Sequence, residues 1–238
     1  DTSVRQAGPD REQALASLGN AVAHACALCP DVAVQFTHAM IPARDDLIAL
    51  VQRVVGAGAT TVVLADGDGY ALPETFGAIF RGVRERLAGA EDVVLGALCR
   101  NDLGLALANS LSAVRAGARE IVCSIHGLGE RAGIAALEEV AMAVHVNAEY
   151  WGCGTEVRTE ELASASRLVG RLTGMPVPRM KPIVGAGVFQ NGVRVPADAQ
   201  QEEPFRRLTP ALVGVKENRT LLGKTSDMTE LQARFTEL

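Results

Sequence analysis

The sequence has little of what marks secreted, membrane-spanning or nucleic-acid-binding proteins. Its five cysteines are an odd number scattered through 238 residues, which fits a reducing compartment better than a disulfide framework. No apolar run reaches the roughly 18 residues that a membrane span needs, and residues 1–20 lack the basic-then-apolar order of a signal peptide. The formal net charge is −5, without a cluster of Lys and Arg, which argues against a nucleic-acid partner. These absences predict a cytoplasmic protein with neither a membrane nor a nucleic acid as its partner.

Cys26 and Cys29 form the only close pair of cysteines in the sequence. Their C-x-x-C spacing occurs in zinc and redox sites, but no second pair follows at the spacing of a zinc site. The alternative is that both are small apolar residues at the end of a helix. The second interpretation is favoured.

Apolar sequence, by contrast, is plentiful, because 48% of the residues are hydrophobic. Four β-branched apolar runs each predict a buried parallel strand, and they lie at 31–36, 60–64, 92–98 and 120–125. Their starts are 29, 32 and 28 residues apart, about the length of one βα unit. Segments with helical spacing follow them, at 46–55, 75–87, 105–116 and 135–146.

The predicted fold class is therefore α/β, with parallel βα units of a TIM-type barrel. Four units make half of an eight-stranded barrel, so residues 1–150 are predicted to form a partial (βα) barrel. Residues 151–238 are predicted to form a linker and a small, α-rich, irregular C-terminal subdomain, with a helix at 160–172. Half a barrel leaves an open strand edge, which predicts a homo- or hetero-oligomer, or a partner chain that supplies the missing strands.

A polar or glycine-rich loop follows each predicted strand. In βα barrels the loops at this end of the strands form the rim that carries the chemistry. The loops read T-H-A at 37–39, D-G-D-G at 66–69, R-N-D at 100–102 and H-G-L-G-E-R at 126–131. The candidate site residues come from these loops.

Two long motifs resemble the 2-isopropylmalate synthase and homocitrate synthase family. They are N-D-L-G-L-A-L-A-N-S-L at 101–111 and G-L-G-E-R-A-G at 127–133. Shorter matches agree, at 73–74, 181–185, 210–214 and 222–226, and those at 166–169 and 176–178 favour the homocitrate branch. The resemblance implies the C-terminal half of a TIM barrel of the pyruvate carboxyltransferase and HMG-CoA-lyase type.

Members of that family join acetyl-CoA to a 2-oxo acid in a Claisen-type condensation, and a divalent metal polarises the keto group. The resemblance implies that an H-x-H pair would bind the metal, but this sequence has Leu98 and Arg100 at those two positions. Ile134 replaces a further Asn of the family. The R-D-G strand, the H-E-S-G-I-H segment and the acidic motif expected at 39–43 are also missing. These departures predict that the protein uses no metal cofactor and that its catalysis is lost or altered.

Arg100 has two interpretations. A guanidinium repels a cation, but it can hold a carboxylate through two parallel hydrogen bonds. The alternative is a loop arginine that pairs with Asp66, Asp68 or Asp102. The candidate substrate-binding residues are therefore Arg100, Asp66, Asn101, Asp102 and Arg131.

His126 and Glu130 are the candidate catalytic residues. His126 stands where the family usually has Asn, and an imidazole can act as an acid or a base near pH 7. A lone histidine is more often only a hydrogen-bonding residue. Glu130 and Arg131 can also be interpreted as a structural ion pair that braces the rim.

Three functions stay open from the sequence. The first is an active acyltransferase of the homocitrate and isopropylmalate synthase type, with acetyl-CoA as a ligand. The second is a non-catalytic binding or regulatory subunit of a complex. The third is a metal-independent enzyme that binds a carboxylated substrate through Arg100 and His126.

Overall fold

The structure is a computed structural model that describes residues 11–87, 92–189 and 208–215, together with residues 228, 232 and 235. The chain divides into two compact units, Asp1–Val140 and Ala141–Leu238. The domain boundary expected near residue 150 stays a prediction. The family motif at 222–226 lies outside the described residues.

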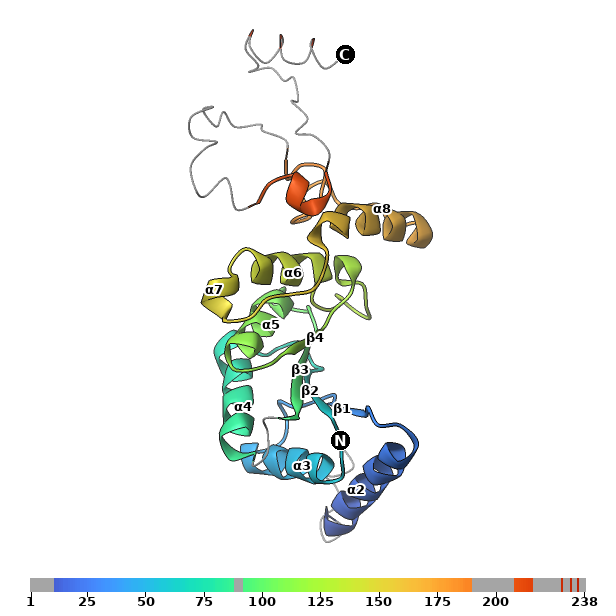
Figure 1. The fold of residues 1–238 in the computed structure, drawn as a ribbon, viewed down its shortest axis with the longest axis vertical. Coiled ribbons are helices and arrows are strands. Elements are labelled where there is room, and N and C mark those ends of the chain that lie inside the picture. Colours follow the sequence, from blue (N-terminus) through green and yellow to red (C-terminus); the bar gives the residue numbers. More distant parts are fainter. Residues whose placement is uncertain are drawn as a thin grey trace. The chain divides into compact units, whose positions relative to one another are not determined.

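The first unit is built on a four-stranded parallel sheet (Figure 1). Its strands are β1 (Ala33–Phe36), β2 (Thr61–Asp66), β3 (Val94–Cys99) and β4 (Glu120–Val122). Each strand pairs in parallel with the next one along the chain. All six residues of β2 are buried, which explains the apolar run of its four central residues, 62–65. The predicted α/β class, with consecutive parallel βα units, is confirmed.

β4 ends three residues earlier than the segment 120–125 that the sequence predicted. The chain forms a short 3-10 turn at Ile125–Gly127 instead. His126 in this turn has a φ of 61°, and a positive φ cannot continue a strand. The chain therefore leaves the sheet before His126.

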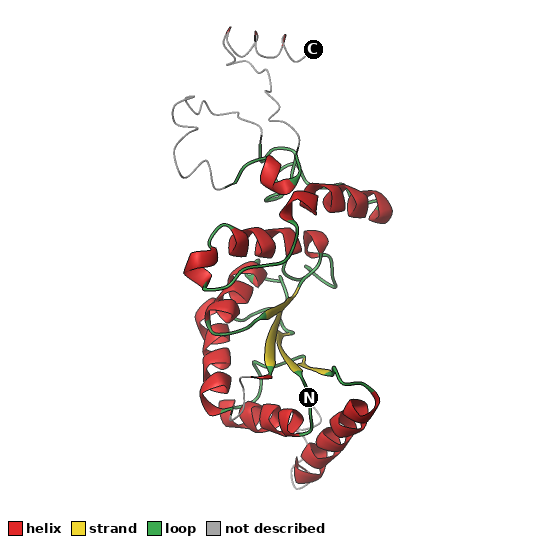
Figure 2. Ribbon diagram, viewed as in Figure 1, coloured by secondary structure: helices red, strands yellow, loops and turns green. Residues whose placement is uncertain are grey.

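Five helices accompany the sheet in the described part of this region. They are α2 (Arg11–Leu28), α3 (Arg44–Gly56), α4 (Pro73–Arg86), α5 (Ala106–Arg115) and α6 (Leu137–His145). α2 packs on α3, α3 on α4 and α4 on α5, and α4 and α5 lie along one side of the strands (Figure 2). The four helices α3 to α6 agree with the predicted helical segments to within two residues. α2 was not predicted, because Val22 is the one described α2 side chain that is fully buried, so the helix carries no clear apolar stripe.

The sequence of α4 shows why a helix forms there. Pro73 occupies its first turn, where the missing N–H of proline removes no helical hydrogen bond. Phe76, Phe80 and Val83 recur at helical spacing and are all buried. The rings of Phe76 and Phe80 meet edge to face, with centroids 5.3 Å apart. This apolar stripe attaches α4 to the sheet.

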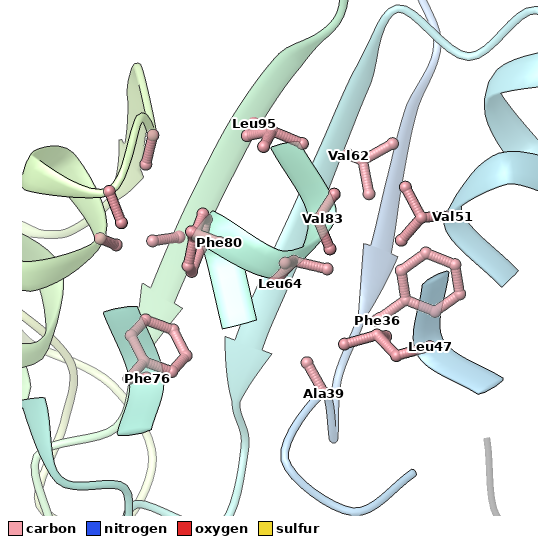
Figure 3. Close-up of a cluster of buried hydrophobic side chains, with 14 of the residues drawn as sticks. Phe36, Ala39, Leu47, Val51, Val62, Leu64, Phe76, Phe80, Val83 and Leu95 are labelled. Atoms are coloured by element: carbon pink, nitrogen blue, oxygen red, sulfur yellow. The ribbon is translucent and has the colours of Figure 1, made fainter. Parts of the chain in front are cut away.

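The core of the first unit lies between the strands and helices α3 and α4 (Figure 3). Val62 and Leu64 of β2 and Leu95 of β3 point toward the helices, where Phe80 and Val83 meet them. Because side chains alternate along a strand, the other face of the sheet carries residues such as Val63. This core holds the carboxyl ends of β2 and β3 in a fixed register, Asp66 beside Cys99.

The second unit contains the short helices α7 (Ala148–Trp151), η4 (Thr159–Glu161) and η6 (Ala211–Val213) and the longer α8 (Leu162–Thr173). α8 confirms the helix predicted at 160–172. Val213 of the P-A-L-V-G motif is fully buried. Gly214 has a φ of 74°, and a side chain there would collide with the carbonyl oxygen of Glu160, so this close approach of two segments requires glycine. None of the helices in the described ranges is long and apolar enough to cross a membrane.

We expect the core around β2 to dominate the stability of the first unit. Leu64→Ala removes a fully buried side chain and should lower the free energy of unfolding by about 2–5 kcal/mol. The matched variant Leu28→Ala truncates an exposed leucine at the end of α2 and should change the free energy by less than about 0.5 kcal/mol. Urea unfolding followed by circular dichroism measures both. Equal effects of the two variants would contradict the position of the core.

Candidate functional site

Three loops that follow β2, β3 and β4 meet at the carboxyl ends of the strands and form the rim: residues 66–72, 100–105 and 123–134. The amide of Arg100 donates to the carbonyl oxygen of Asp66 at 3.3 Å, and the amide of Asn101 donates to that of Gly133 at 3.0 Å. Arg100 also forms an isolated backbone bridge with Ile134. All seven residues that the sequence singled out for the site lie on this rim.

Arg131 connects the three rim loops. Its Nε and Nη2 atoms each lie 2.8 Å from a carboxylate oxygen of Asp102, and Nη2 also donates to the carbonyl oxygen of Gly67 at 3.0 Å. The hydrogen bonds to Asp102 raise the pKa of Arg131 above its usual value. Two parallel hydrogen bonds fix the orientation of both side chains. Arg131 thus braces the rim, and Asp102 is its partner.

Asp66 is buried, with 1% of its surface exposed. Its Oδ1 accepts from the amide of Gly69 at 2.9 Å and its Oδ2 from the amide of Ala71 at 3.0 Å. Gly69 has a φ of 78°, and a side chain there would collide with the carboxylate of Asp102. The carboxylate of Asp66 therefore shapes the loop 66–72 from inside.

Asn109 holds the same loop from α5, and the sequence analysis did not single it out. Its side-chain amide donates to the carbonyl oxygen of Ala71 at 2.9 Å, and Asn109 itself is buried. The signal was present, because a polar residue stands on the buried face of a predicted helix and must find a partner there. Asn101 contacts the start of α5, since its Oδ1 accepts from the amide of Ala106 at 3.2 Å.

Arg100 forms an ion pair with Glu130. Its Nη2 donates to Oε2 of Glu130 at 2.6 Å, and its Nη1 donates to the main-chain oxygen of the same residue at 3.3 Å. The Arg100 side chain is 21% exposed and that of Glu130 is 82% exposed. A partly buried arginine thus pairs with an exposed glutamate.

This pairing differs from two interpretations of the sequence. One was that Arg100 is a loop arginine that pairs with Asp66, Asp68 or Asp102, and the other was that Glu130 pairs with its neighbour Arg131. Backbone amides occupy the carboxylate of Asp66, and Arg131 occupies that of Asp102. Glu130 is the acid that faces Arg100.

His126 is held through its main chain. Its amide donates to Oε2 of Glu138 at 3.1 Å, and Glu138 is a buried carboxylate on α6. The left-handed backbone at His126 is costly for a residue other than glycine, and this contact stabilises it. The sequence analysis did not single out Glu138. An acid or base role for the His126 side chain stays a proposal.

The loop after β1 brings a further histidine to this end of the sheet. His38 forms an isolated bridge with Asp66, and its Nδ1 lies 3.3 Å from Oδ1 of Asp68. A side chain at Gly67 would collide with the carbonyl oxygen of Thr37. The sequence placed His38 in a rim loop but gave it no role.

Cys99 lies at the end of β3, between Leu98 and Arg100, and is fully buried. Burial raises the pKa of its thiol to about 12; the charge of Asp66 acts in the same direction, and a hydrogen bond with Ser110 opposes them. The thiolate is the reactive form of cysteine. Cys99 is therefore an inert thiol near neutral pH.

The parallel βα units form part of a βα barrel, and the candidate site lies on the rim at the carboxyl ends of its strands. A family model described as HMGL-like matches residues 4–169. The chain belongs to this HMGL-like family of pyruvate carboxyltransferase domains.

Curated relatives with similar sequences are named 2-isopropylmalate synthase. That of Clostridium kluyveri (strain ATCC 8527) is 39% identical over 217 residues, which cover 90% of this chain and 42% of the relative. That of Nitrosomonas eutropha is 43% identical over 196 residues, which cover 82% of this chain and 38% of the relative. The chain thus spans about two fifths of the length of these relatives. The preference for the homocitrate branch stays a prediction.

Solved structures agree on the fold. An HMG-CoA lyase from Brucella melitensis matches with a TM-score of 0.53 and 19% identity, over 68% of this chain and 59% of that chain. An HMG-CoA lyase from Acinetobacter baumannii, in complex with coenzyme A and 3-methylmalate, matches with a TM-score of 0.52 and 25% identity, over 69% of this chain and 53% of that chain.

Family membership corrects the expectation about the cofactor. Leu98, Arg100 and Ile134 led to the prediction that the protein uses no metal, but its relatives are 2-isopropylmalate synthases, a family that uses a divalent metal. The prediction rested on substitutions and missing motifs in a chain that spans only about two fifths of its relatives, and it was wrong for the family to which the chain belongs. Within the described ranges, no three His, Cys, Asp or Glu side chains lie together so as to hold an ion. The described rim does not by itself form a complete metal site.

The raised pKa of Cys99 gives a direct test of this part of the rim. At pH 8 we expect iodoacetamide to label the exposed Cys29 and to leave Cys99 unmodified, because the thiol of Cys99 stays protonated until the pH approaches 12. Peptide mass spectrometry distinguishes the two sites. In urea both cysteines should react. Rapid labelling of Cys99 in the folded protein would contradict its burial.

Proposed function

We propose that the protein is a 2-isopropylmalate synthase-like acyltransferase with altered catalysis, in which Arg100 binds the carboxylate of a 2-oxo acid. The family reaction is a Claisen-type condensation of acetyl-CoA with such an acid. The proposal rests on the family, on relatives about 40% identical that are named 2-isopropylmalate synthase, and on the rim. A neighbour of similar fold has coenzyme A and 3-methylmalate, a dicarboxylate, in its complex.

The single observation that carries the proposal is the position and partner of Arg100. Its side chain is 21% exposed, and its guanidinium is already bound by one carboxylate, that of Glu130. A planar guanidinium with low exposure suits bidentate recognition of a carboxylate, because little water competes for its N–H groups. A ligand carboxylate can therefore bind in the same manner.

The proposal of altered catalysis rests on the residues that replace the family's metal ligands at the rim. Leu98, Arg100 and Ile134 occupy positions where the family has two histidines and an asparagine. Arg100 supplies a fixed positive charge there, which favours an anionic ligand. His126 and Glu130 are the rim residues that we propose for acid or base chemistry, and Asn101, Asp102 and Arg131 position the loops around them.

A second function, a non-catalytic binding or regulatory subunit, is favoured by the sheet. In the described part of the chain, β1 and β4 each pair with one neighbouring strand, whereas a closed barrel pairs every strand on both sides. In this proposal a second polypeptide, identical or different, pairs with these open edges in an oligomer. Release of free coenzyme A from acetyl-CoA in the presence of 2-oxoisovalerate, followed with a thiol reagent, distinguishes an enzyme from a subunit that only binds.

Arg100→Gln tests the proposed site directly. Loss of a charge-assisted hydrogen bond contributes about 1.5–3 kcal/mol, so binding of 2-oxoisovalerate should weaken roughly ten- to hundredfold in titration calorimetry. Arg86→Gln is the matched control, because Arg86 also pairs with an exposed carboxylate, that of Asp45, but does so between α4 and α3. It should leave the affinity unchanged. Equal affinity of the wild type and Arg100→Gln would refute the role of Arg100.

A further inference from the structure

We infer that Glu130 acts as a built-in competitor for the anionic ligand and occupies Arg100 until a ligand carboxylate displaces it. This inference rests on the proposed carboxylate site at Arg100. It adds a regulatory role for a residue that the sequence suggested as catalytic.

The contacts of Arg100 are those that a bound carboxylic acid would make. One guanidinium nitrogen donates to a carboxylate oxygen of Glu130 at 2.6 Å, and the other donates to a carbonyl oxygen at 3.3 Å. The main-chain oxygen belongs to the loop, so the side-chain carboxylate is the acceptor that a 2-oxo acid could replace. The side chain of Glu130 therefore occupies the position of a ligand carboxylate.

The main chain around Glu130 is fixed, whereas its side chain is not enclosed. The amide of Gly133 donates to the carbonyl oxygen of Glu130 at 2.9 Å, and the amide of Asn101 donates to that of Gly133 at 3.0 Å. The side chain of Glu130 is 82% exposed, so little packing opposes its rotation into water. The carboxylate can leave Arg100 without moving the loop.

The neighbouring ion pair shows the contrast. Asp102 is 20% exposed and two nitrogens of Arg131 bind its carboxylate, whereas Glu130 is 82% exposed and one nitrogen of Arg100 binds its carboxylate. Arg131 and Asp102 thus stay bound to each other, while Arg100 can exchange one carboxylate for another. Such an exchange conserves the number of ion pairs at Arg100, and the released carboxylate of Glu130 is solvated.

The cost of the exchange is small. Exposed ion pairs contribute little to stability, so removal of the competing carboxylate should tighten ligand binding only about two- to fivefold. A residue that merely stabilised the rim would weaken binding when it was replaced. The direction of the change therefore separates the two roles.

The experiment compares the full chain with Glu130→Gln and Asp45→Asn, using 2-oxoisovalerate as the probe in titration calorimetry. Glu130→Gln should bind about two- to fivefold more tightly. Asp45→Asn, which removes a similarly exposed carboxylate from an arginine elsewhere, should bind as the wild type does. The double variant Arg100→Gln/Glu130→Gln should lose the gain, because the cation that both carboxylates share is absent.

Each other outcome has a defined meaning. If the wild type binds and Arg100→Gln does not, but Glu130→Gln binds equally or more weakly, the competitor role is overturned and the proposed site stands. If neither the wild type nor Glu130→Gln binds the acid, the proposed function fails and the competitor role fails with it. Thermal unfolding of each variant shows that the compared proteins are folded.

Discussion

The guanidinium of Arg131 links the loops that follow three different strands. It reaches the carboxylate of Asp102 in one loop and the carbonyl oxygen of Gly67 in another, while its own main chain belongs to the third. Parallel strands bring their carboxyl ends to one edge, and a few backbone hydrogen bonds, such as that from Arg100 to Asp66, join the loops beyond them. One arginine with a forked set of donors adds a side-chain link between the three loops. We expect the placement of the other rim side chains to depend on it.

The position of Arg131 also determines which acid pairs with Arg100. Because Asp102 is bound by Arg131 and Asp66 by backbone amides, Arg100 pairs with the exposed Glu130. The family to which the chain belongs uses a divalent metal, and the described rim presents a guanidinium where histidine ligands would stand. This guanidinium is the feature on which the proposed carboxylate site rests.

The sequence predicted the sheet well, because its signals are local. Apolar runs such as that of β2 are read directly from residue types, and the motif at 101–111 and the G-E-R motif placed the rim loops correctly. The extent of β4 could not be predicted, since it depends on the left-handed backbone at His126 and on its contact with the distant Glu138. α2 was missed because its side chains are mostly exposed.

The partners of Arg100 and Arg131 could not be predicted from the sequence, for a different reason. Asp66, Asp102 and Glu130 compete for Arg100 and Arg131, and the outcome is decided by backbone geometry rather than by order along the chain. Glu130 and Arg131 are neighbours in sequence, yet they bind different partners. The metal prediction failed because substitutions and missing motifs in a chain that spans about two fifths of its relatives were weighed against a family that uses a divalent metal.

Hydrogen exchange at the amides of Gly69 and Ala71 tests most directly whether one ion pair holds the rim. Both amides donate to Asp66 in the loop that Arg131 fastens through Gly67. Exchange should become faster in Arg131→Gln and in Asp102→Asn, and the double variant should exchange no faster than Arg131→Gln, because that variant already lacks the contact with Asp102. Exchange rates that match the wild type, or effects that add fully in the double variant, would contradict this account.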